Sequence, residues 1–147
     1  MLRTLLIASF VLLLPLNALA EEEGVTDPYC FNEAGVSYGV SSKILWAISR
    51  HESRHNPYAV HQNKNGTYDY CHMQINSSWA RVLGSQSWSG LSNPCHCTKV
   101  GAWVLAGCIK RHGYSWEAIG CYNASSPDKR LAYGRQIYRT MNVWGLL

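Results

Sequence analysis

Apolar residues recur with a helical spacing over most of the chain. Between Ser42 and Asn56 they repeat every three or four positions, which predicts an amphipathic helix ended by Asn56-Pro57. The same spacing, together with capping residues, predicts further helices over residues 28–38, 77–83, 98–110, 116–122 and from 127 onward. On the last helix we expect an inward face made of Leu131, Ile137, Tyr138 and Met141. Residues 84–94 are rich in Ser and Gly and predict a loop.

One segment departs from the helical spacing and predicts a β-hairpin. Asn65-Gly66 is a strong signal for a tight hairpin turn, and residues 58–60 and 67–70 would form its two strands. No other segment predicts β structure convincingly. The fold class that follows is α+β and mainly α, with a small hairpin lobe beside a helical lobe.

The first residues have the features of an export signal. A positive start is followed by an apolar run from Leu5 to Leu14 and by the small residues Ala18-Leu19-Ala20. The apolar run is too short to span a bilayer comfortably, and no later run is apolar enough. We therefore expect residues 1–20 to be a signal peptide and residues 21–147 to form one domain.

The charge of the chain is small and spread out. The formal net charge is +4, and basic residues such as Lys43, Lys99 and Arg135 lie far apart in the sequence. Nucleic-acid-binding domains gather their basic residues on one face, so this pattern disfavours a nucleic-acid partner. It suits a mildly anionic polymer. We expect a monomer that needs no cofactor.

Six cysteines behind an export signal predict a disulfide framework. Six cysteines allow about 15 complete pairings, and their spacing does not choose among them. A metal site at Cys95-His96-Cys97 is the alternative. The spacing there is too tight for a zinc site and no second ligand pair follows, so we expect no metal.

Two carboxylates flank the predicted hairpin. Glu52 and Asp69 are 17 positions apart, a layout that can place them on opposite walls of one cleft. Glu52 follows Ile48 by four positions and therefore continues the apolar face of its helix. Burial without a cation would raise the pKa of this carboxyl group. The alternative is an exposed Glu52 paired with Arg50 or Arg54.

Three short motifs resemble those of the soluble lytic transglycosylase family. They are Glu52-Ser53, the run from Met73 to Ser77, and Cys121-Tyr122-Asn123-Ala124. In that family the motifs read Glu-Ser, Gly-Leu-Met-Gln and Ala-Tyr-Asn. The likeness is greatest to small secreted members associated with type III secretion, type IV pilus or conjugation systems. Residues 52–77 also resemble c-type lysozyme, and both families share the lysozyme fold.

The resemblance implies an enzyme that cleaves the β-1,4 bond between N-acetylmuramic acid and N-acetylglucosamine in peptidoglycan of the bacterial periplasm. Glu52 would act first as acid and then as base, closing a 1,6-anhydro ring on the muramoyl sugar. Components of a secretion or pilus machine are the implied protein partners. The residues implied to line the site or position the sugar are Ser53, Met73, Gln74, Tyr122 and Asn123.

Asp69 separates two versions of this chemistry. Lysozyme-type hydrolysis uses a second carboxylate to stabilise or trap the glycosyl cation, so a catalytic Asp69 favours a muramidase as the alternative enzyme. Asp69 can instead pin the hairpin turn. A third reading is a glycan-binding assembly module without activity, because Cys71-His72 replaces the family's Gly-Leu and Cys121 replaces its Ala.

These departures also bear on the disulfides. By resemblance Cys30 pairs with Cys95. The two departing motifs face one another across the family's cleft, which suggests a Cys71–Cys121 bridge. Cys97 and Cys108 would then remain, about 16 Å apart on one helix, too far for a bond unless that helix starts late. The other pairing is Cys71–Cys97 with Cys108–Cys121.

His72 replaces an apolar residue of the cleft. It would either contact substrate, tune Glu52 or have no role in the chemistry. The remaining histidines are expected on the solvated surface: His51, His55, His61, His96 and His112.

Overall fold

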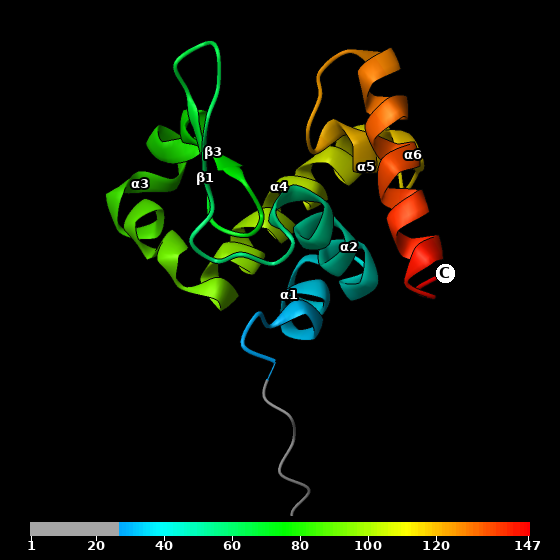
Figure 1. Cartoon of the computed structure of the whole chain (residues 1–147), viewed down its shortest axis with the longest axis horizontal. Helices are drawn as coiled ribbons and strands as arrows, with labels where there is room; N and C mark the ends of the chain where they lie inside the picture. Colours follow the sequence, from blue (N-terminus) through cyan, green and yellow to red (C-terminus); the bar gives the residue numbers. More distant parts are fainter. Residues whose placement is uncertain (1–26) are drawn as a thin grey trace, which may run out of the picture.

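The structure is a computed structural model that describes residues 27–147. The expected signal peptide, residues 1–20, lies outside these residues. A helical lobe and a smaller lobe stand side by side, and the long helix α4, Pro94–His112, runs from one to the other (Figure 1). The helical lobe contains α1 Phe31–Tyr38, α2 Ser42–Ser53, α5 Trp116–Cys121 and α6 Pro127–Val143. The predicted fold class is confirmed.

The smaller lobe is a three-stranded antiparallel sheet beside a helix. Its strands are β1 Val60–Gln62, β2 Tyr68–Tyr70 and β3 Ile75–Asn76, in the order β1-β2-β3. Gly66 has a φ of 82°, which the turn between β1 and β2 requires and which glycine adopts at little cost. The predicted hairpin is therefore confirmed, but its first strand covers residues 60–62 rather than 58–60. β3 was not predicted, because two residues are too few to show an alternating pattern.

Residues 84–94 are mostly helical, so the predicted loop is wrong. A short 3-10 turn, Ser77–Trp79, leads into α3, Ala80–Ser89, and a second 3-10 turn covers Gly90–Ser92. Only Gly84, with a φ of 77°, interrupts α3. Tertiary packing outweighs the poor helix propensity of this segment, since the Trp88 ring packs edge-on against Tyr70 at 5.2 Å.

Two helix starts also differ from expectation. α1 begins at Phe31 rather than Pro28, because the Asp27 carboxylate accepts the N–H groups of Tyr29 and Phe31 at 3.0 and 2.8 Å and closes a separate turn. α4 begins four residues earlier than predicted, where the Asn93 side chain accepts the backbone N–H of His96 at 2.9 Å.

α6 presents a different inward face from the one expected. Ile137 and Met141 are buried as predicted, whereas Leu131 and Tyr138 are exposed. Tyr133 takes the inward position one turn before Ile137, because residues four apart lie on one face of a helix.

The disulfides are Cys30–Cys95, Cys71–Cys97 and Cys108–Cys121. The first agrees with the expectation, and the suggested Cys71–Cys121 bridge is wrong. The early start of α4 brings Cys97 next to Cys71, with 6.4 Å between their Cα atoms, while Cys108 is free to reach Cys121 at 5.7 Å. Cys97 and Cys108 cannot pair, since one continuous helix separates them.

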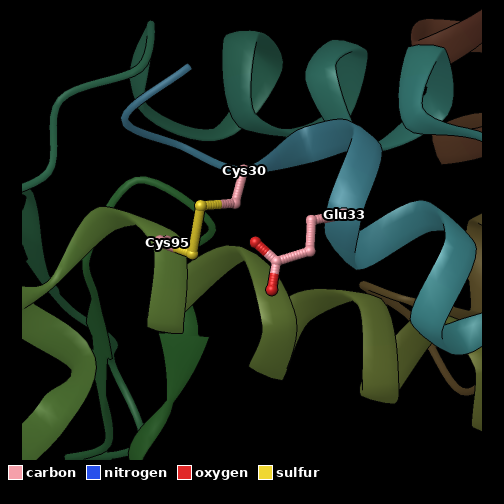
Figure 2. Close-up of side chains that lie close together, drawn as sticks. All are labelled: Cys30, Glu33 and Cys95. Carbon is pink, nitrogen blue, oxygen red and sulfur yellow. A yellow bond between two sulfur atoms is a disulfide. The ribbon is translucent and has the colours of Figure 1, made fainter. Parts of the chain in front are cut away.

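Figure 2 shows the first bridge, which joins the start of α1 to the start of α4, with Glu33 beside it. These three side chains are close enough to suggest a metal site. Both sulfurs are bonded to each other, however, and the Glu33 carboxylate is paired with Lys99 at 2.7 Å. The cluster therefore offers no thiolate ligand.

His72 lies in the core rather than in a cleft. It is fully buried, and its Nε2 lies 3.0 Å from the Pro94 carbonyl, which only accepts, so this nitrogen carries the proton. Nδ1 then accepts the Ser49 hydroxyl at 2.7 Å. Burial lowers the pKa of His72 to about 4, so the ring is neutral near pH 7. His72 thus joins α2 to α4 and contacts no substrate-accessible space.

The surface assignment of the other histidines is only partly right. His55 Nδ1 lies 2.8 Å from the Ser49 hydroxyl, and His96 Nε2 lies 2.9 Å from the Ser87 carbonyl. Both residues are partly buried, and so is His112, which lines the cleft described below, whereas His51 and His61 are exposed as expected. Within residues 27–147, no helix combines the length and apolar character needed to cross a membrane.

Candidate active site

A cleft of about 1030 Å³ separates the hairpin from α4 and α5. The C-terminal end of α2, the sheet, α4, α5 and the segment after α5 all contribute to its walls. The structure brings five of the predicted site residues together in this cleft: Glu52, Asp69, Gln74, Tyr122 and Asn123. Ser53 and Met73, also predicted, do not line it.

Glu52 lies in the last turn of α2, where the buried stripe of that helix meets the cleft. Its pKa is raised to about 7. Burial is the largest cause, since a low dielectric disfavours the charged form, and the negative charge of Asp69 adds to it. A hydrogen bond donated by the Tyr133 hydroxyl acts in the opposite direction. Near neutral pH a large fraction of Glu52 therefore holds a proton it can donate.

Asp69 lies on the central strand β2 and faces the same cleft. The side-chain amide of Asn63 donates to one of its oxygens at 2.8 Å, and the amide of Asn76 donates to the other at 2.7 Å. Two donors on neighbouring chain segments hold the carboxylate in one orientation. Asp69 thus joins the β1–β2 turn to β3 through these hydrogen bonds, and its carboxylate also lines the cleft.

Tyr122 is anchored by the backbone opposite it. Its hydroxyl donates to the Met73 carbonyl at 2.8 Å. The Met73 side chain is fully buried against Gly101, where an added Cβ would lie 2.6 Å from the Met73 Cε and 3.1 Å from the Tyr122 hydroxyl. The Met73 carbonyl therefore anchors Tyr122, while the Met73 side chain lies in the core and does not reach the cleft, contrary to the expectation.

Ser53 and Gln74 both donate hydrogen bonds to carbonyl groups of the loop that precedes β3. The Ser53 hydroxyl donates to the His72 carbonyl at 2.9 Å and accepts the Asn56 N–H at 3.0 Å, so it ties the end of α2 to this loop. Gln74 has a φ of 50° and donates from its side chain to the Cys71 carbonyl at 2.9 Å. Ser53 thus fixes the end of the helix that carries Glu52, and of the two residues only Gln74 lines the cleft.

Tyr133 is a site residue that the sequence reasoning missed. Its ring is buried in α6, and its hydroxyl donates to a Glu52 oxygen from 81 positions along the chain. Burial and the nearby Glu52 raise the pKa of Tyr133 well above its usual value, so the hydroxyl remains a donor. Its burial could have been predicted, because Tyr133 lies four residues before Ile137, which was expected to face the core.

A protonated carboxylic acid and a second, fixed carboxylate share one cleft between a helical lobe and a small sheet. This fold and site define a protein of the lysozyme-like class. Residues 29–137 match the family described as "Transglycosylase SLT domain", and the chain belongs to that family.

Curated relatives agree with this assignment. Protein IpgF of Shigella sonnei is 39% identical over 117 residues, which are 75% of this chain and 77% of that protein. Invasion protein IagB of Salmonella typhimurium strain SL1344 is 38% identical over 104 residues, covering 69% and 65%. X polypeptide of Escherichia coli is 35% identical over 119 residues, covering 75% and 70%. The three disulfides indicate a place outside the cytoplasm.

Proposed function

We propose that this protein is a peptidoglycan lytic transglycosylase that cleaves the β-1,4 bond between N-acetylmuramic acid and N-acetylglucosamine and forms a 1,6-anhydro muramoyl end. One observation carries the proposal: Glu52, with a pKa raised to about 7, lines an open cleft of about 1030 Å³. Departure of a sugar oxygen requires an acid that still holds its proton near neutral pH.

Glu52 performs two proton transfers in this reaction. It first gives its proton to the glycosidic oxygen as the bond from that oxygen to the muramoyl C1 breaks, and the released chain ends in a hydroxyl. The Glu52 carboxylate then takes the proton of the muramoyl C6 hydroxyl, whose oxygen forms the new bond to C1. No water is consumed, and Glu52 regains its starting state.

The surrounding groups support these two steps. The charge on C1 is positive when the first bond breaks, and the fixed Asp69 carboxylate stabilises it from the β2 side of the cleft. Tyr133 orients the Glu52 carboxyl and stabilises its charged form, which the second step needs. Tyr122, Asn123 and Gln74 line the same cleft and are the groups we assign to positioning the sugar.

The geometry of Asp69 also favours a second candidate, lysozyme-type hydrolysis. The two amide donors hold this carboxylate towards the cleft, where it would stabilise or trap the glycosyl cation until water attacks. The two candidates share Glu52 as the acid and differ in the group that attacks C1, the C6 hydroxyl or water, and therefore in the product.

We place the activity in the bacterial periplasm, where the protein acts as a monomer that opens the cell wall locally for a secretion, pilus or conjugation apparatus. The disulfides support a compartment that oxidises thiols. The likeness to proteins named IpgF and invasion protein IagB supports a link to a machine that crosses the wall.

Digestion of purified peptidoglycan, followed by mass spectrometry of the soluble products, tests the proposal. We expect muramoyl ends that are lighter by one water than reducing ends, and reducing ends would favour hydrolysis instead. The Glu52→Gln protein should release no product. Glu33→Gln is the matched control, because Glu33 is exposed and paired with Lys99 away from the cleft. If wild-type protein releases nothing and Glu52→Gln binds peptidoglycan equally well, the protein is a binding module.

A further inference from the structure

The three disulfides differ in their access to solvent and to the cleft. Both residues of the Cys71–Cys97 bridge are buried, and those of the Cys30–Cys95 bridge are half-buried and lie outside the cleft lining. In the Cys108–Cys121 bridge, Cys108 is buried, whereas Cys121 is half-buried and lines the cleft. A molecule that enters the cleft therefore meets Cys121.

A cation accompanies this cleft bridge. The Arg111 Nη2 donates to the sulfur atoms of Cys108 and Cys121, at 3.4 and 3.2 Å. The guanidinium has no carboxylate within ion-pair distance among residues 27–147, so its charge is not neutralised. A neighbouring cation stabilises a thiolate, which is the form in which sulfur attacks and leaves during thiol–disulfide exchange. Arg111 therefore favours the opening of this bridge by a thiol.

The other half-buried bridge has the opposite charge beside it. A carboxylate oxygen of Glu33 lies within 4.8 Å of both sulfurs of Cys30–Cys95 (Figure 2). This carboxylate disfavours a thiolate that approaches or leaves. Lys99 pairs with Glu33 at 2.7 Å, which weakens the repulsion. Two bridges of similar burial thus differ in the sign of the charge that contacts or adjoins their sulfurs.

The cleft bridge also holds a wall of the cleft. Cys121 is the last residue of α5 and directly precedes Tyr122 and Asn123, which line the cleft. Its bond to Cys108 attaches the end of α5 to α4. Without this bond, the wall keeps the hydrogen bond from the Tyr122 hydroxyl to the Met73 carbonyl but loses its covalent link to α4. Opening of the bridge therefore loosens this wall without releasing it.

We propose that the Cys108–Cys121 bridge is a thiol-exchange site, at which a dithiol reductant attacks Cys121 and loosens the wall that contains Tyr122 and Asn123. The attacking thiolate bonds to the Cys121 sulfur, the bond to Cys108 breaks, and Cys108 leaves as a thiolate beside Arg111. The second thiolate of the reductant then attacks its own sulfur in the mixed disulfide and releases Cys121. Two electrons pass from the dithiol, which becomes a disulfide, and the two cysteines take up the protons that its thiols lose.

Limited reduction of the native protein with dithiothreitol tests this site. Free thiols are trapped with N-ethylmaleimide and located by mass spectrometry of peptides. We expect label on Cys108–Cys121 before Cys30–Cys95, and on the buried bridge last. Arg111→Gln should slow labelling of the cleft bridge about five-fold. Lys110→Gln is the matched control, because it removes the same charge from an exposed neighbour outside the cleft lining, and it should label at the wild-type rate.

Earlier labelling of Cys30–Cys95 would overturn the proposal, and so would a wild-type rate in Arg111→Gln. Glu33→Gln gives a second check on the role of charge. It should speed labelling of Cys30–Cys95, because it removes the carboxylate and leaves Lys99 unpaired, and it should not change the rate at the cleft bridge. None of these rates depends on a reaction with peptidoglycan, so they are decided separately from the function proposed above.

The loosening of the wall has its own readout, which rests on that proposed function. In the Glu52→Gln protein, which binds without cleaving, the same dose of dithiothreitol should weaken binding to peptidoglycan about five-fold, and reoxidation should restore it. The control carries Cys108→Ala and Cys121→Ala in the same background, and its binding should not respond to dithiothreitol. Unchanged binding after the cleft bridge opens would show that the bridge does not control the wall.

Discussion

At the scale of single residues, three neighbours set the protonation of Glu52. Burial and the charge of Asp69 favour the acid form, and the Tyr133 hydroxyl favours the carboxylate. The acid form predominates below about pH 7 and the base form above it, so both forms are accessible near neutrality. A single group can then serve as acid and as base, provided that these opposing effects stay in balance.

The pH dependence of activity should report the Tyr133 hydrogen bond. In the Tyr133→Phe protein the charged form of Glu52 loses its donor, so the pKa of Glu52 rises. We expect the descending limb of the pH–activity profile to move upward by about one pH unit, with a lower kcat. Tyr138→Phe is the control, because Tyr138 lies on the same helix but is 45% exposed. An unmoved limb in Tyr133→Phe would contradict this role.

The buried Glu52 should also make stability depend on pH. Its pKa is raised from 4.5 to about 7 on folding, so the folded state binds the proton more tightly, and stability is lost as the pH rises through this window. Glu52→Gln removes the effect. Its free energy of unfolding should match that of the wild type at pH 4 and exceed it by about 2–3 kcal/mol at pH 8.

Urea unfolding at a series of pH values measures this difference. His72 titrates in the opposite sense, since its pKa is lowered to about 4 and stability is lost as the pH falls from 6.5. That contribution is common to both proteins and cancels when their free energies are subtracted. A constant difference between the two proteins from pH 4 to pH 8 would show that Glu52 is not buried in its acid form.

At the scale of elements, α5 and α6 meet backbone to backbone. A Cβ placed on Gly120 would lie 1.8 Å from the Arg130 carbonyl oxygen, so only glycine allows this approach. Gly120 is two residues before Tyr122, and the same contact therefore places the wall of the cleft that contains Tyr122 and Asn123. The close approach of α5 and α6 therefore matters for the shape of the cleft as well as for the packing of the core.

Replacing Gly120 with alanine should push α5 away from α6. The contact is with backbone, which cannot rotate out of the way, so we expect a loss of about 3 kcal/mol or more in the free energy of unfolding and a marked loss of activity. Gly107→Ala is the matched control in α4, where an added Cβ meets only the Arg111 Nη1 at 3.5 Å. Gly107→Ala should be neutral or slightly stabilising. Similar melting curves for the two variants would refute the explanation.

At the scale of the whole molecule, α4 is the element to which the rest is covalently attached. Each of the three bridges has one cysteine on α4, namely Cys95, Cys97 and Cys108. The partners lie beside α1, in the loop before β3 and in α5. The bridges thus join both lobes and the far wall of the cleft to one rigid helix, which keeps the two walls of the cleft in register.

The chain-entropy description of disulfides predicts an order of importance. The bridges span 65, 26 and 13 positions for Cys30–Cys95, Cys71–Cys97 and Cys108–Cys121. Replacing each pair with alanines should lower the free energy of unfolding by about 4.3, 3.5 and 3 kcal/mol in that order, because longer loops restrict the unfolded chain more. Urea unfolding of the three double variants checks the order, and a reversed order would show that local contacts outweigh loop closure.

Local sequence patterns were sufficient to predict several elements of this protein. The α2 stripe that carries Glu52 depends on neighbours three and four positions away, and the β1–β2 turn depends on Asn65-Gly66. Interactions of this range leave a periodic or compositional mark in the sequence. The spacing of two carboxylates around the hairpin added Asp69 as a candidate, and the family motifs added Gln74, Tyr122 and Asn123. All four line the cleft beside Glu52.

Other features depend on segments that meet only after folding. The hydrogen bond from Tyr133 to Glu52 spans 81 positions, and the choice of Cys97 as the partner of Cys71 follows from where α4 begins. His72 looked like a cleft residue because of its place in a motif, yet packing between α2 and α4 buries it. Periodicity tells which side of an element is apolar, but the contact made by that side is set by the packing of the entire chain.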